Sequence, residues 1–188
     1  MNLSILPNLL CVVRMLLAIP VVFAILGGYY HWTLVLFFIA AVTDGLDGWL
    51  ATHFNWTSEA GKLLDPVADK LLLVSVFVAL TLVGLVPLWL AFAAVLRDVV
   101  IGGGAAAYRL LYGPLNGRPT LPSKLNTLLQ ICFVLVVVSD AAWPAVPDAV
   151  VVVLGAAMFV TIVVSGLDYV LTYSRRATQA ARASRALR

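Results

Sequence analysis

The stretch AVVVVLGAAMFVTIVVSGL runs from Ala149 to Leu167 without a charged residue and lies between Asp148 and Asp168. About 20 consecutive apolar residues are enough for a helix to cross the hydrocarbon core of a bilayer. Because this run is apolar on every side of a helix, lipid suits it better than the one-sided core of a soluble protein. It therefore predicts a transmembrane helix.

The rest of the chain repeats this pattern. Glycine, proline and charged residues divide it into apolar stretches at about 5–27, 30–50, 66–84, 87–110, 125–142 and 149–171. A transmembrane barrel would need shorter segments of alternating polarity, whereas a helix satisfies its backbone hydrogen bonds internally. The sequence predicts an all-α integral membrane protein, a bundle of six transmembrane helices. We expect one domain over residues 1–172 and a basic tail at 173–188.

The composition excludes several classes of protein. Hydrophobic residues make up 63% of the 188 residues and charged residues 11%, whereas a soluble domain is about 45–50% apolar and about 25% charged. A soluble enzyme, a disordered chain and a collagen-like or disulfide-stapled protein are therefore excluded. Cys11 and Cys132 are interpreted as small hydrophobic residues. The first stretch is not expected to be a cleaved signal peptide, because its early cation, Arg14, lies inside the apolar run.

The basic residues predict the orientation of the helices. The first, third and fifth connectors contain no lysine or arginine, whereas the second, the fourth and the tail do. Because cytoplasmic segments carry the excess of positive charge, both termini are predicted to be cytoplasmic, with an aromatic belt at the outer face. The net charge of +3 thus reflects topology rather than binding to nucleic acid. The basic residues of the second connector, the fourth connector and the tail are Lys62, Arg109, Arg118, Lys124, Arg175, Arg176, Arg182, Arg185 and Arg188, and the belt residues are Tyr29, Tyr30, Trp32 and Trp143.

The tail after Tyr173 alternates arginine with alanine, glutamine and serine. We interpret it as a solvated, partly helical segment that anchors the topology. The alternative is a contact with anionic lipid headgroups, to which each arginine adds about 1 kcal/mol.

Four of the nine acidic residues lie in one window around the second connector. Asp44 and Asp47 are three residues apart, and Asp65 and Asp69 are four apart. These spacings place each pair on one face of a helix. Because the connector is short, we expect two antiparallel neighbouring helices that present all four carboxylates to one place.

Carboxylates at a membrane edge require an explanation, because each costs roughly 2.5–3.5 kcal/mol on insertion scales. They can take up protons or share cations. Lys62 and Lys70 supply two charges at most, and lysines near helix ends often extend to the interface instead. Oxygen ligands without histidine or cysteine favour Mg²⁺ or Mn²⁺. Two such ions would neutralise four carboxylates and suit displacement at phosphorus.

The same window carries a motif. It reads Asp44-Gly-Leu-Asp47-Gly48-Trp-Leu-Ala51, then nine residues, then Gly61-Lys-Leu-Leu-Asp65-Pro-Val-Ala-Asp69. This resembles the signature of the CDP-alcohol phosphotransferase family, D-x-x-D-G-x-x-A-R, eight or nine residues, G-x-x-x-D-x-x-x-D. The family's arginine is Thr52 here, a departure that concerns nucleotide binding and leaves the carboxylates in place.

The resemblance implies an enzyme that displaces CMP from a CDP-linked lipid, such as CDP-diacylglycerol, with an acceptor hydroxyl. Asp69 matches the general base and belongs to the carboxylate cluster. Asn8, in a Pro-Asn segment similar to the family's, is either a nucleotide contact or a helix cap. Small residues near the motif also suit plain helix packing. The matching positions are Asp44, Asp47, Asp65 and Asp69 for the metal ions and Gly48, Ala51 and Gly61 for the nucleotide.

Four basic residues are candidates for binding a phosphate on the acceptor, namely Arg97, Lys124, Arg109 and Arg118. Arg97 has an alternative role as the partner of Asp98, but helix residues one apart are not expected to face each other. We therefore favour phosphate binding for Arg97 and Lys124. Arg109 and Arg118 are also interpretable as topology markers only.

The acceptor is suggested by a second resemblance. Arg97-Asp98 and the later Ser123-Lys-Leu-Asn126-Thr-Leu-Leu-Gln130 look like the eukaryotic-type cardiolipin synthase branch of the family. Phosphatidylglycerolphosphate synthases are similar in the same places. The branch implies phosphatidylglycerol as acceptor and cardiolipin as product.

Carboxylates in membrane helices also mark ion pathways, so a divalent-cation transporter or channel is the alternative of another class. A pathway needs acids across the membrane, whereas the four motif aspartates gather near one face. A silent paralogue has only Thr52 in its favour. We expect a multi-pass protein of the bacterial inner membrane with its site facing the cytoplasm, and the Gly102-Gly103-Gly104 run allows a homodimer.

Overall fold

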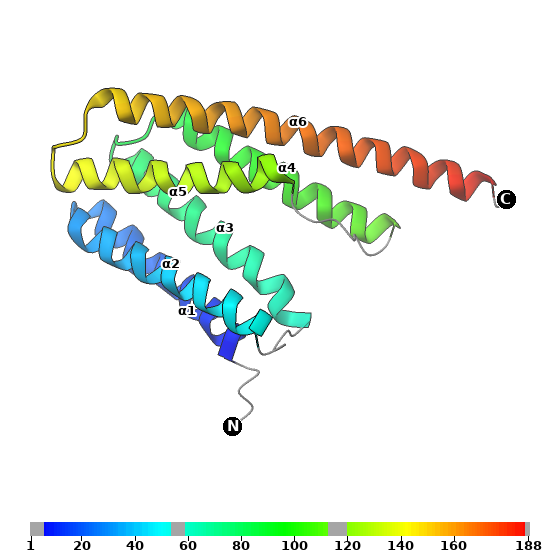
Figure 1. The fold of residues 1–188 in the computed structure, drawn as a ribbon, viewed down its shortest axis with the longest axis horizontal. Coiled ribbons are helices and arrows are strands. Elements are labelled where there is room, and N and C mark those ends of the chain that lie inside the picture. The colour runs from blue at the N-terminus through cyan, green and yellow to red at the C-terminus, as the bar shows by residue number, and fades with distance from the viewer. Residues whose placement is uncertain (1–5, 54–58, 113–119, 187–188) are drawn as a thin grey trace. The chain divides into compact units, whose positions relative to one another are not determined.

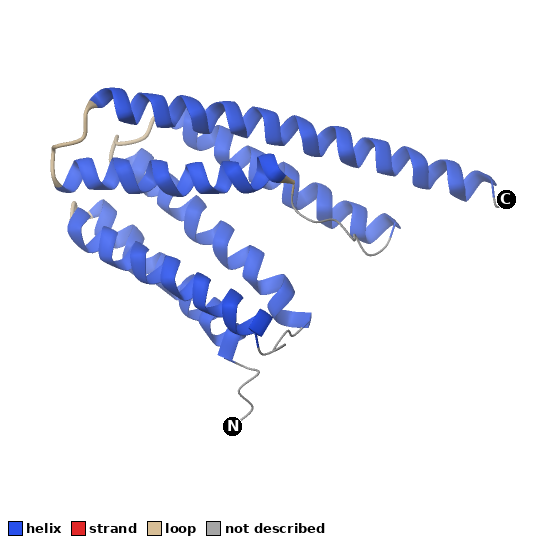
Figure 2. Cartoon of the chain, in the orientation of Figure 1, coloured by secondary structure: helices blue, strands red, loops and turns tan. Residues whose placement is uncertain are grey.

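The computed structural model describes residues 6–53, 59–112 and 120–186, and within these ranges it contains six helices and no strand (Figures 1 and 2). The all-α prediction is therefore confirmed for the described part of the chain. The helices are α1 (Leu6–Leu26), α2 (Tyr30–His53), α3 (Glu59–Leu82), α4 (Leu88–Tyr112), α5 (Leu121–Ala142) and α6 (Asp148–Ala186).

Each predicted apolar stretch corresponds to one helix, but two helices are longer than predicted. α3 begins at Glu59 rather than at 66, and α6 continues to Ala186 rather than ending near 171. The apolar pattern marks only the part of a helix that avoids water, whereas alanine, arginine, lysine and glutamate also form helices in water. For this reason the tail continues α6, which reaches 39 residues.

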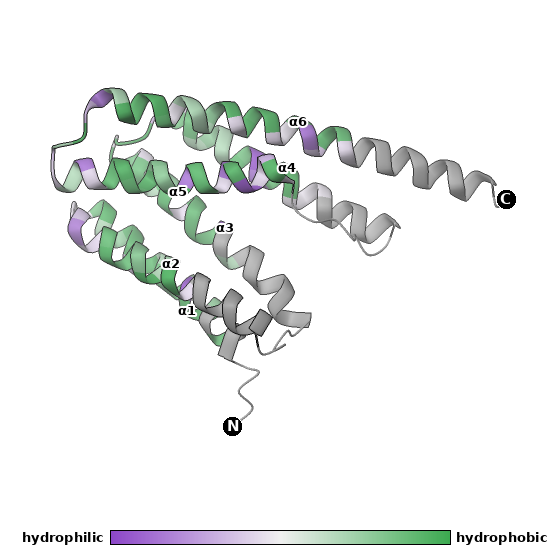
Figure 3. Cartoon of the chain, viewed as in Figure 1, coloured by the Kyte–Doolittle hydropathy of each residue, from purple (hydrophilic) through white to green (hydrophobic). Residues whose placement is uncertain are grey.

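Two helical segments of the described chain are long and apolar enough to cross a membrane, Leu121–Ala142 and Asp148–Thr172. Hydrophobic residues also cover most of the described length of the other helices (Figure 3). Large apolar side chains point outward, and Phe23, Phe38 and Leu82 are 69%, 68% and 71% exposed. An apolar exterior on this scale is typical of a surface that contacts lipid. The shorter apolar segments are Cys11–Leu26, Tyr30–Thr43 and Lys70–Leu82.

The helices form two compact units. The first contains the chain up to Pro87 together with Val134–Pro147, and therefore α1, α2, α3 and the second part of α5. In this unit α1 packs against both α2 and α3 (Figure 1). Its most buried apolar side chains include Val21, Ile25, Val76 and Leu80, all 0% exposed.

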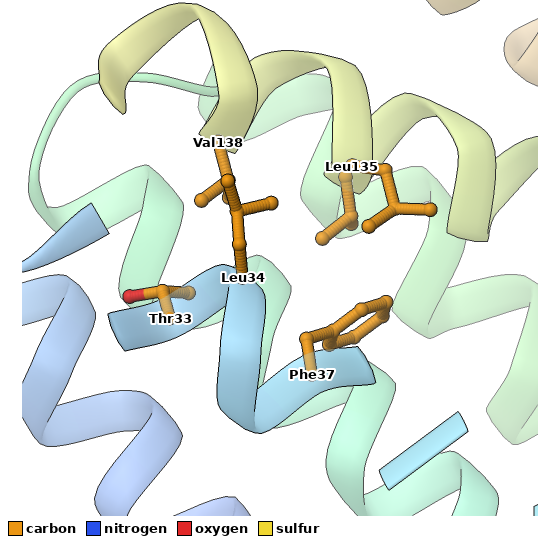
Figure 4. A pocket seen from close by; sticks show the side chains of 6 residues that line it. Thr33, Leu34, Phe37, Leu135 and Val138 are labelled. Atoms are coloured by element: carbon orange, nitrogen blue, oxygen red, sulfur yellow. The ribbon is translucent and has the colours of Figure 1, made fainter. Parts of the chain in front are cut away.

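α2 also contacts the second part of α5 in the first unit. The gap between them is apolar and too narrow to admit a water molecule, so it is a packing contact and not a ligand site. Near one end of this contact His31 and Trp143 meet edge to face, with ring centroids 4.3 Å apart. The gap is lined by Thr33, Leu34 and Phe37 of α2 and by Val134, Leu135 and Val138 of α5 (Figure 4).

α1 and α3 end in the same type of turn. Gly28 and Gly84 have positive φ angles of 73° and 78°, the left-handed conformation that favours glycine after a helix. The pattern of amide bonds is that of a Schellman motif, which satisfies the last carbonyls of the helix. These bonds run from Gly28 to Ile25, from Tyr29 to Ala24, from Gly84 to Thr81 and from Leu85 to Leu80, at 2.8–3.1 Å.

The second unit contains Leu88–Phe133 and the chain from Asp148 onward, and therefore α4, the first part of α5 and α6. α4 packs along α6 (Figure 1). The rings of Trp89 and Phe159 meet edge to face at 5.3 Å and join these two helices.

Gly155 of α6 lies at the closest approach in the second unit. A Cβ atom built there would be 3.3 Å from the ring of Phe133 on α5 and 3.7 Å from Leu90 on α4. The missing side chain therefore lets three helices approach one another, as small residues do in membrane bundles.

Candidate functional site

The four motif carboxylates lie on two helices of the first unit. Asp44 and Asp47 belong to the C-terminal part of α2, and Asp65 and Asp69 to the N-terminal part of α3. The backbone is helical at all four positions, as predicted, so each pair shares a helix face. Their side chains lie outside the described part of the structure, and their role as metal ligands stays a prediction.

The nucleotide candidates lie on the same helices and on α1. Gly48 and Ala51 are in α2, Gly61 is in α3, and Asn8 is in the first turn of α1; the side chains at these positions are outside the described part. Because α1 packs against both α2 and α3, all these positions belong to one unit.

Arg14 lies on α1 in the first unit, and its side chain is only 1% exposed. A buried guanidinium is stable only when anionic or strongly polar groups compensate its charge. The helices that pack on α1 are those that carry the motif aspartates. The first unit therefore combines a buried cation with the acidic motif.

A buried polar site lies around Arg97 in the second unit. Arg97 is 5% exposed and its Nε donates to Oγ of Ser165 on α6 at 2.9 Å. Its Nη2 donates to Oγ of Ser123 on α5 at 2.7 Å. One guanidinium on α4 thus holds hydroxyls of the two other helices in this unit.

Arg97 also pairs with Asp98, and here the expectation from sequence was wrong. Arg97 Nη1 lies 2.8 Å from Asp98 Oδ1, and the two side chains are 3% and 8% exposed. The rule that helix residues one apart do not face each other describes the Cβ directions. The long arginine side chain bends back far enough to reach its neighbour, so the guanidinium is largely compensated in charge.

Among the other acceptor candidates, Lys124 is the one whose side chain the structure describes, and that side chain makes no hydrogen bond or ion pair with Arg97 in the described residues. Lys124 is exposed, and the 100° step of a helix turns it to the side of α5 opposite Asn126. Arg109 is in the last turn of α4 with its side chain outside the described part, and Arg118 lies outside the described ranges. The structure therefore assembles a polar site around Arg97 without Lys124.

A group of polar side chains extends the contacts of Arg97 through the second unit. Thr161 of α6 donates to Oδ1 of Asn126 on α5 at 3.1 Å, and Asn126, Gln130 and Ser165 are at most 1% exposed. The spacing of these residues, three and four along α5 and four along α6, gives one polar line on each helix. We call Arg97, Ser123, Asn126, Gln130, Thr161 and Ser165 the polar seam.

Sequence reasoning identified only part of the polar seam. Ser123, Asn126 and Gln130 belong to the stretch that resembles the cardiolipin synthase branch, whereas Thr161 and Ser165 belong to no motif identified in the sequence. Their spacing of four within an otherwise apolar stretch was the available signal, because polar residues in such helices often bond across to a neighbour.

Comparison with protein families gives a match over almost the whole chain. The model of the CDP-alcohol phosphatidyltransferase family matches residues 4–181. This range includes the acidic motif and the polar seam.

Individual relatives agree with this match. The chain is 33% identical over 148 residues to a probable cardiolipin synthase (CMP-forming) of Drosophila melanogaster, covering 69% of this chain and 45% of the relative. It is 33% identical to the human cardiolipin synthase (CMP-forming), covering 68% and 48%. It is 32% identical to a probable phosphatidylglycerophosphate synthase of Mycobacterium tuberculosis, covering 88% and 79%. The chain thus spans about half the length of the two cardiolipin synthases.

Proposed function

Because the chain belongs to the CDP-alcohol phosphatidyltransferase family, we propose that it transfers the phosphatidyl group of CDP-diacylglycerol to phosphatidylglycerol, forming cardiolipin and CMP. The observation that carries the proposal is the acidic motif on α2 and α3 within the family match. The names of the relatives from Drosophila melanogaster and human support the choice of acceptor.

The residues proposed to bind metal are Asp44, Asp47, Asp65 and Asp69. Their oxygen-only donor set fits Mg²⁺ or Mn²⁺, with two ions for four carboxylates. When bound, these ions supply charge neutralisation at the diphosphate. Gly48, Ala51, Gly61 and Asn8 are proposed to contact the nucleotide.

The proposed reaction is an in-line displacement at phosphorus. Asp69 accepts the proton of the acceptor hydroxyl, whose oxygen forms a new bond to the phosphatidyl phosphorus. The bond from that phosphorus to the bridging oxygen breaks, and CMP leaves with that oxygen. The protein contributes chiefly by positioning the two substrates and by excluding water.

Arg97 and Lys124, with Arg109 and Arg118, are the residues proposed to bind the acceptor phosphate. Arg97 contributes through N–H groups that its three side-chain bonds do not use. Its pairing with Asp98 lowers its net attraction for an anion. Lys124 is exposed and has no such competitor in the described residues.

We further propose that all six helices span a bacterial inner membrane, with both termini and the acidic motif on the cytoplasmic side. The distribution of lysine and arginine among the connectors supports this orientation. A homodimer is also proposed, because Gly102 and Gly103 are exposed and a Cβ atom at either would meet nothing within 4 Å.

A second candidate function is phosphatidylglycerophosphate synthesis with glycerol-3-phosphate as acceptor. It is favoured by the relative from Mycobacterium tuberculosis, because that match covers 88% of this chain and 79% of the relative. The two functions share the donor and the acidic motif and differ only in the acceptor.

The deciding experiment uses the purified protein with CDP-diacylglycerol and Mg²⁺. Phosphatidylglycerol, glycerol-3-phosphate, inositol phosphate and serine are offered in turn, and CMP and the lipid product are measured. Cardiolipin formed from phosphatidylglycerol supports the proposal. Product from glycerol-3-phosphate alone rejects cardiolipin synthesis, and no CMP with any acceptor rejects the transferase.

A further inference from the structure

Arg14 is a cation in the buried side of α1. It is 1% exposed and shares this side with Ala18 and Val21, which are 3% and 0% exposed. It is also the one lysine or arginine in the sequence of α1. Because arginine stays charged in proteins, its burial requires compensation by anionic or strongly polar groups.

The first unit contains few anions that could compensate Arg14. Among the side chains that the structure describes in this unit, the acidic one is that of Asp140 on α5. Asp140 is close in sequence to Trp143, whose ring meets His31 in the first turn of α2. The acidic motif lies at the other end of α2. The remaining acids of the unit are Glu59 and the four motif aspartates.

The acidic motif lies at the level of Arg14 along the helices. A short turn leads from α1 back into α2, and α3 runs alongside α1 again (Figure 1). At about 1.5 Å per residue, Arg14 lies about 18 Å from the end of α1, Asp44 about 21 Å from the start of α2 and Asp69 about 20 Å from the end of α3. The other acids of α2 and α3 lie about one to three turns farther from this end of the unit, namely Asp47, Asp65 and Glu59.

Asp44 and Asp69 also continue the buried lines of their helices. On α2, Phe37 and Ala40 are 5% and 1% exposed, and Asp44 follows Ala40 after four residues. On α3, Leu73 is 5% exposed, and Asp69 precedes it by four residues. Residues three or four apart share one side of a helix, so both positions lie on the buried sides of their helices.

Resting on the metal site of the proposed function, we propose that Arg14 is a positioning residue whose guanidinium pairs with the carboxylates of Asp44 and Asp69. Side chains of a helix lean toward its N-terminus, which for α1 is the direction of the acidic motif. The five N–H groups of a guanidinium are enough for two carboxylates.

The pairing is compatible with metal binding by the same carboxylates. Each carboxylate has two oxygens, so one oxygen can accept from Arg14 while the other remains for a cation. Groups that hold metal-ligating carboxylates in place typically change metal affinity by about 10–100-fold when they are removed. Arg14 would therefore orient the motif without touching either substrate.

The first test is a double-mutant cycle on the metal-free protein. Arg14→Met, Asp44→Asn and Asp69→Asn are compared with the two double variants that contain Arg14→Met, by thermal unfolding in detergent with EDTA. We expect Arg14→Met to lower the melting temperature by about 10 °C, as the breaking of a buried ion pair predicts. Each double variant should lose clearly less than the sum of its single losses, because the two residues interact.

Asp140→Asn is the matched control in the same cycle. Asp140 is an acid of the first unit at the end far from the motif, so its loss and that of Arg14→Met should add. Arg14→Lys takes the place of Arg14→Met throughout if the latter does not fold. Additive losses with both Asp44 and Asp69 overturn the inference, because they show that other polar groups compensate Arg14.

The second test measures Mn²⁺ binding to Arg14→Lys. Lysine keeps the charge but lacks the planar fork of arginine, so a change in affinity reports the orientation of the carboxylates. The Kd for Mn²⁺ is expected to rise about tenfold or more, and an unchanged Kd overturns the positioning role. A wild-type protein that neither binds Mn²⁺ nor releases CMP rejects the proposed function, whereas the cycle in EDTA still decides whether Arg14 pairs with the motif.

Discussion

Arg97 Nε on α4 donates a hydrogen bond of 2.9 Å to Oγ of Ser165 on α6, across the interior of the second unit. The same guanidinium bonds Ser123 on α5. In an apolar environment helices gain little from further burial of apolar surface, so polar contacts and close packing decide how they associate. The hydrogen bonds of Arg97 therefore hold the helices of the second unit together, in addition to the packing of apolar side chains.

Replacing Ser165 should reveal the strength of this contact. Ser165→Ala leaves the buried Nε of Arg97 without its acceptor, which costs about 1–3 kcal/mol, so the melting temperature in detergent should fall. Ser139→Ala, a serine of α5 outside the polar seam, is the control and should melt like the wild type. Equal melting temperatures for all three proteins would show that the bond contributes nothing to stability.

Asp69→Asn should abolish turnover while keeping metal affinity largely intact. The amide retains one oxygen for a cation but cannot accept the proton of the acceptor hydroxyl. CMP release and Mn²⁺ binding, measured on the same preparation, test the two halves of this prediction. Normal turnover in Asp69→Asn means that Asp69 is not the base.

Removal of divalent cations should stop CMP release. Chelation with EDTA is expected to reduce the rate to background, and addition of Mg²⁺ or Mn²⁺ should restore it, because both ions prefer oxygen ligands. Ca²⁺, which is larger and accepts looser geometry, should restore it poorly. Full activity in excess EDTA would contradict the metal site proposed for the four aspartates.

The glycines that end α1 and α3 should resist substitution. Gly28→Ala and Gly84→Ala each force a side chain into the left-handed region, at a cost of about 1–2 kcal/mol. Thermal unfolding of each variant measures the effect. Gly102→Ala is the control, because a Cβ there meets nothing within 4 Å in a helix, and alanine favours helices over glycine by about 1 kcal/mol.

Gly155 should be intolerant of large side chains. Gly155→Leu would drive its side chain into Phe133 and Leu90, so we expect a loss of about 1–3 kcal/mol from overpacking. Ala156→Leu, at the neighbouring exposed position of α6, should be tolerated. Similar unfolding temperatures for Gly155→Leu and the wild type would show that these helices can move apart without a loss of stability.

For the described residues, the sequence predicted the number and the order of the helices, because each helix contains one long apolar stretch bounded by glycine, proline or charged residues. The apolar stretches alone missed the start of α3 at Glu59 and the end of α6 at Ala186, since helix formation continues into water, where hydrophobicity gives no signal. The expectation of a partly helical tail after Tyr173 is confirmed as far as Ala186. The Schellman turns at Gly28 and Gly84 coincide with glycines that the sequence already marked as boundaries.

The part of the candidate site that consists of residues close together in the sequence could be predicted. The helical backbone around Asp44 and Asp65 follows from the motif itself. The polar seam was less accessible, because the bond from Thr161 to Asn126 joins residues that are 35 positions apart. The pair of Arg97 with Asp98 was missed because side-chain flexibility outweighs the ideal helical directions.

The Schellman turns at Gly28 and Gly84 also bear on how the chain enters the bilayer during its synthesis. In the proposed orientation these turns are the parts that must cross to the far side, and the segments Gly28–Tyr29 and Val83–Pro87 carry no charge. Their helices satisfy their own terminal carbonyls, which removes much of the cost of moving polar backbone through hydrocarbon. The helices α1 and α2, which pack against each other, can thus be inserted as a hairpin, while the acidic motif stays on the side where the ribosome delivers it.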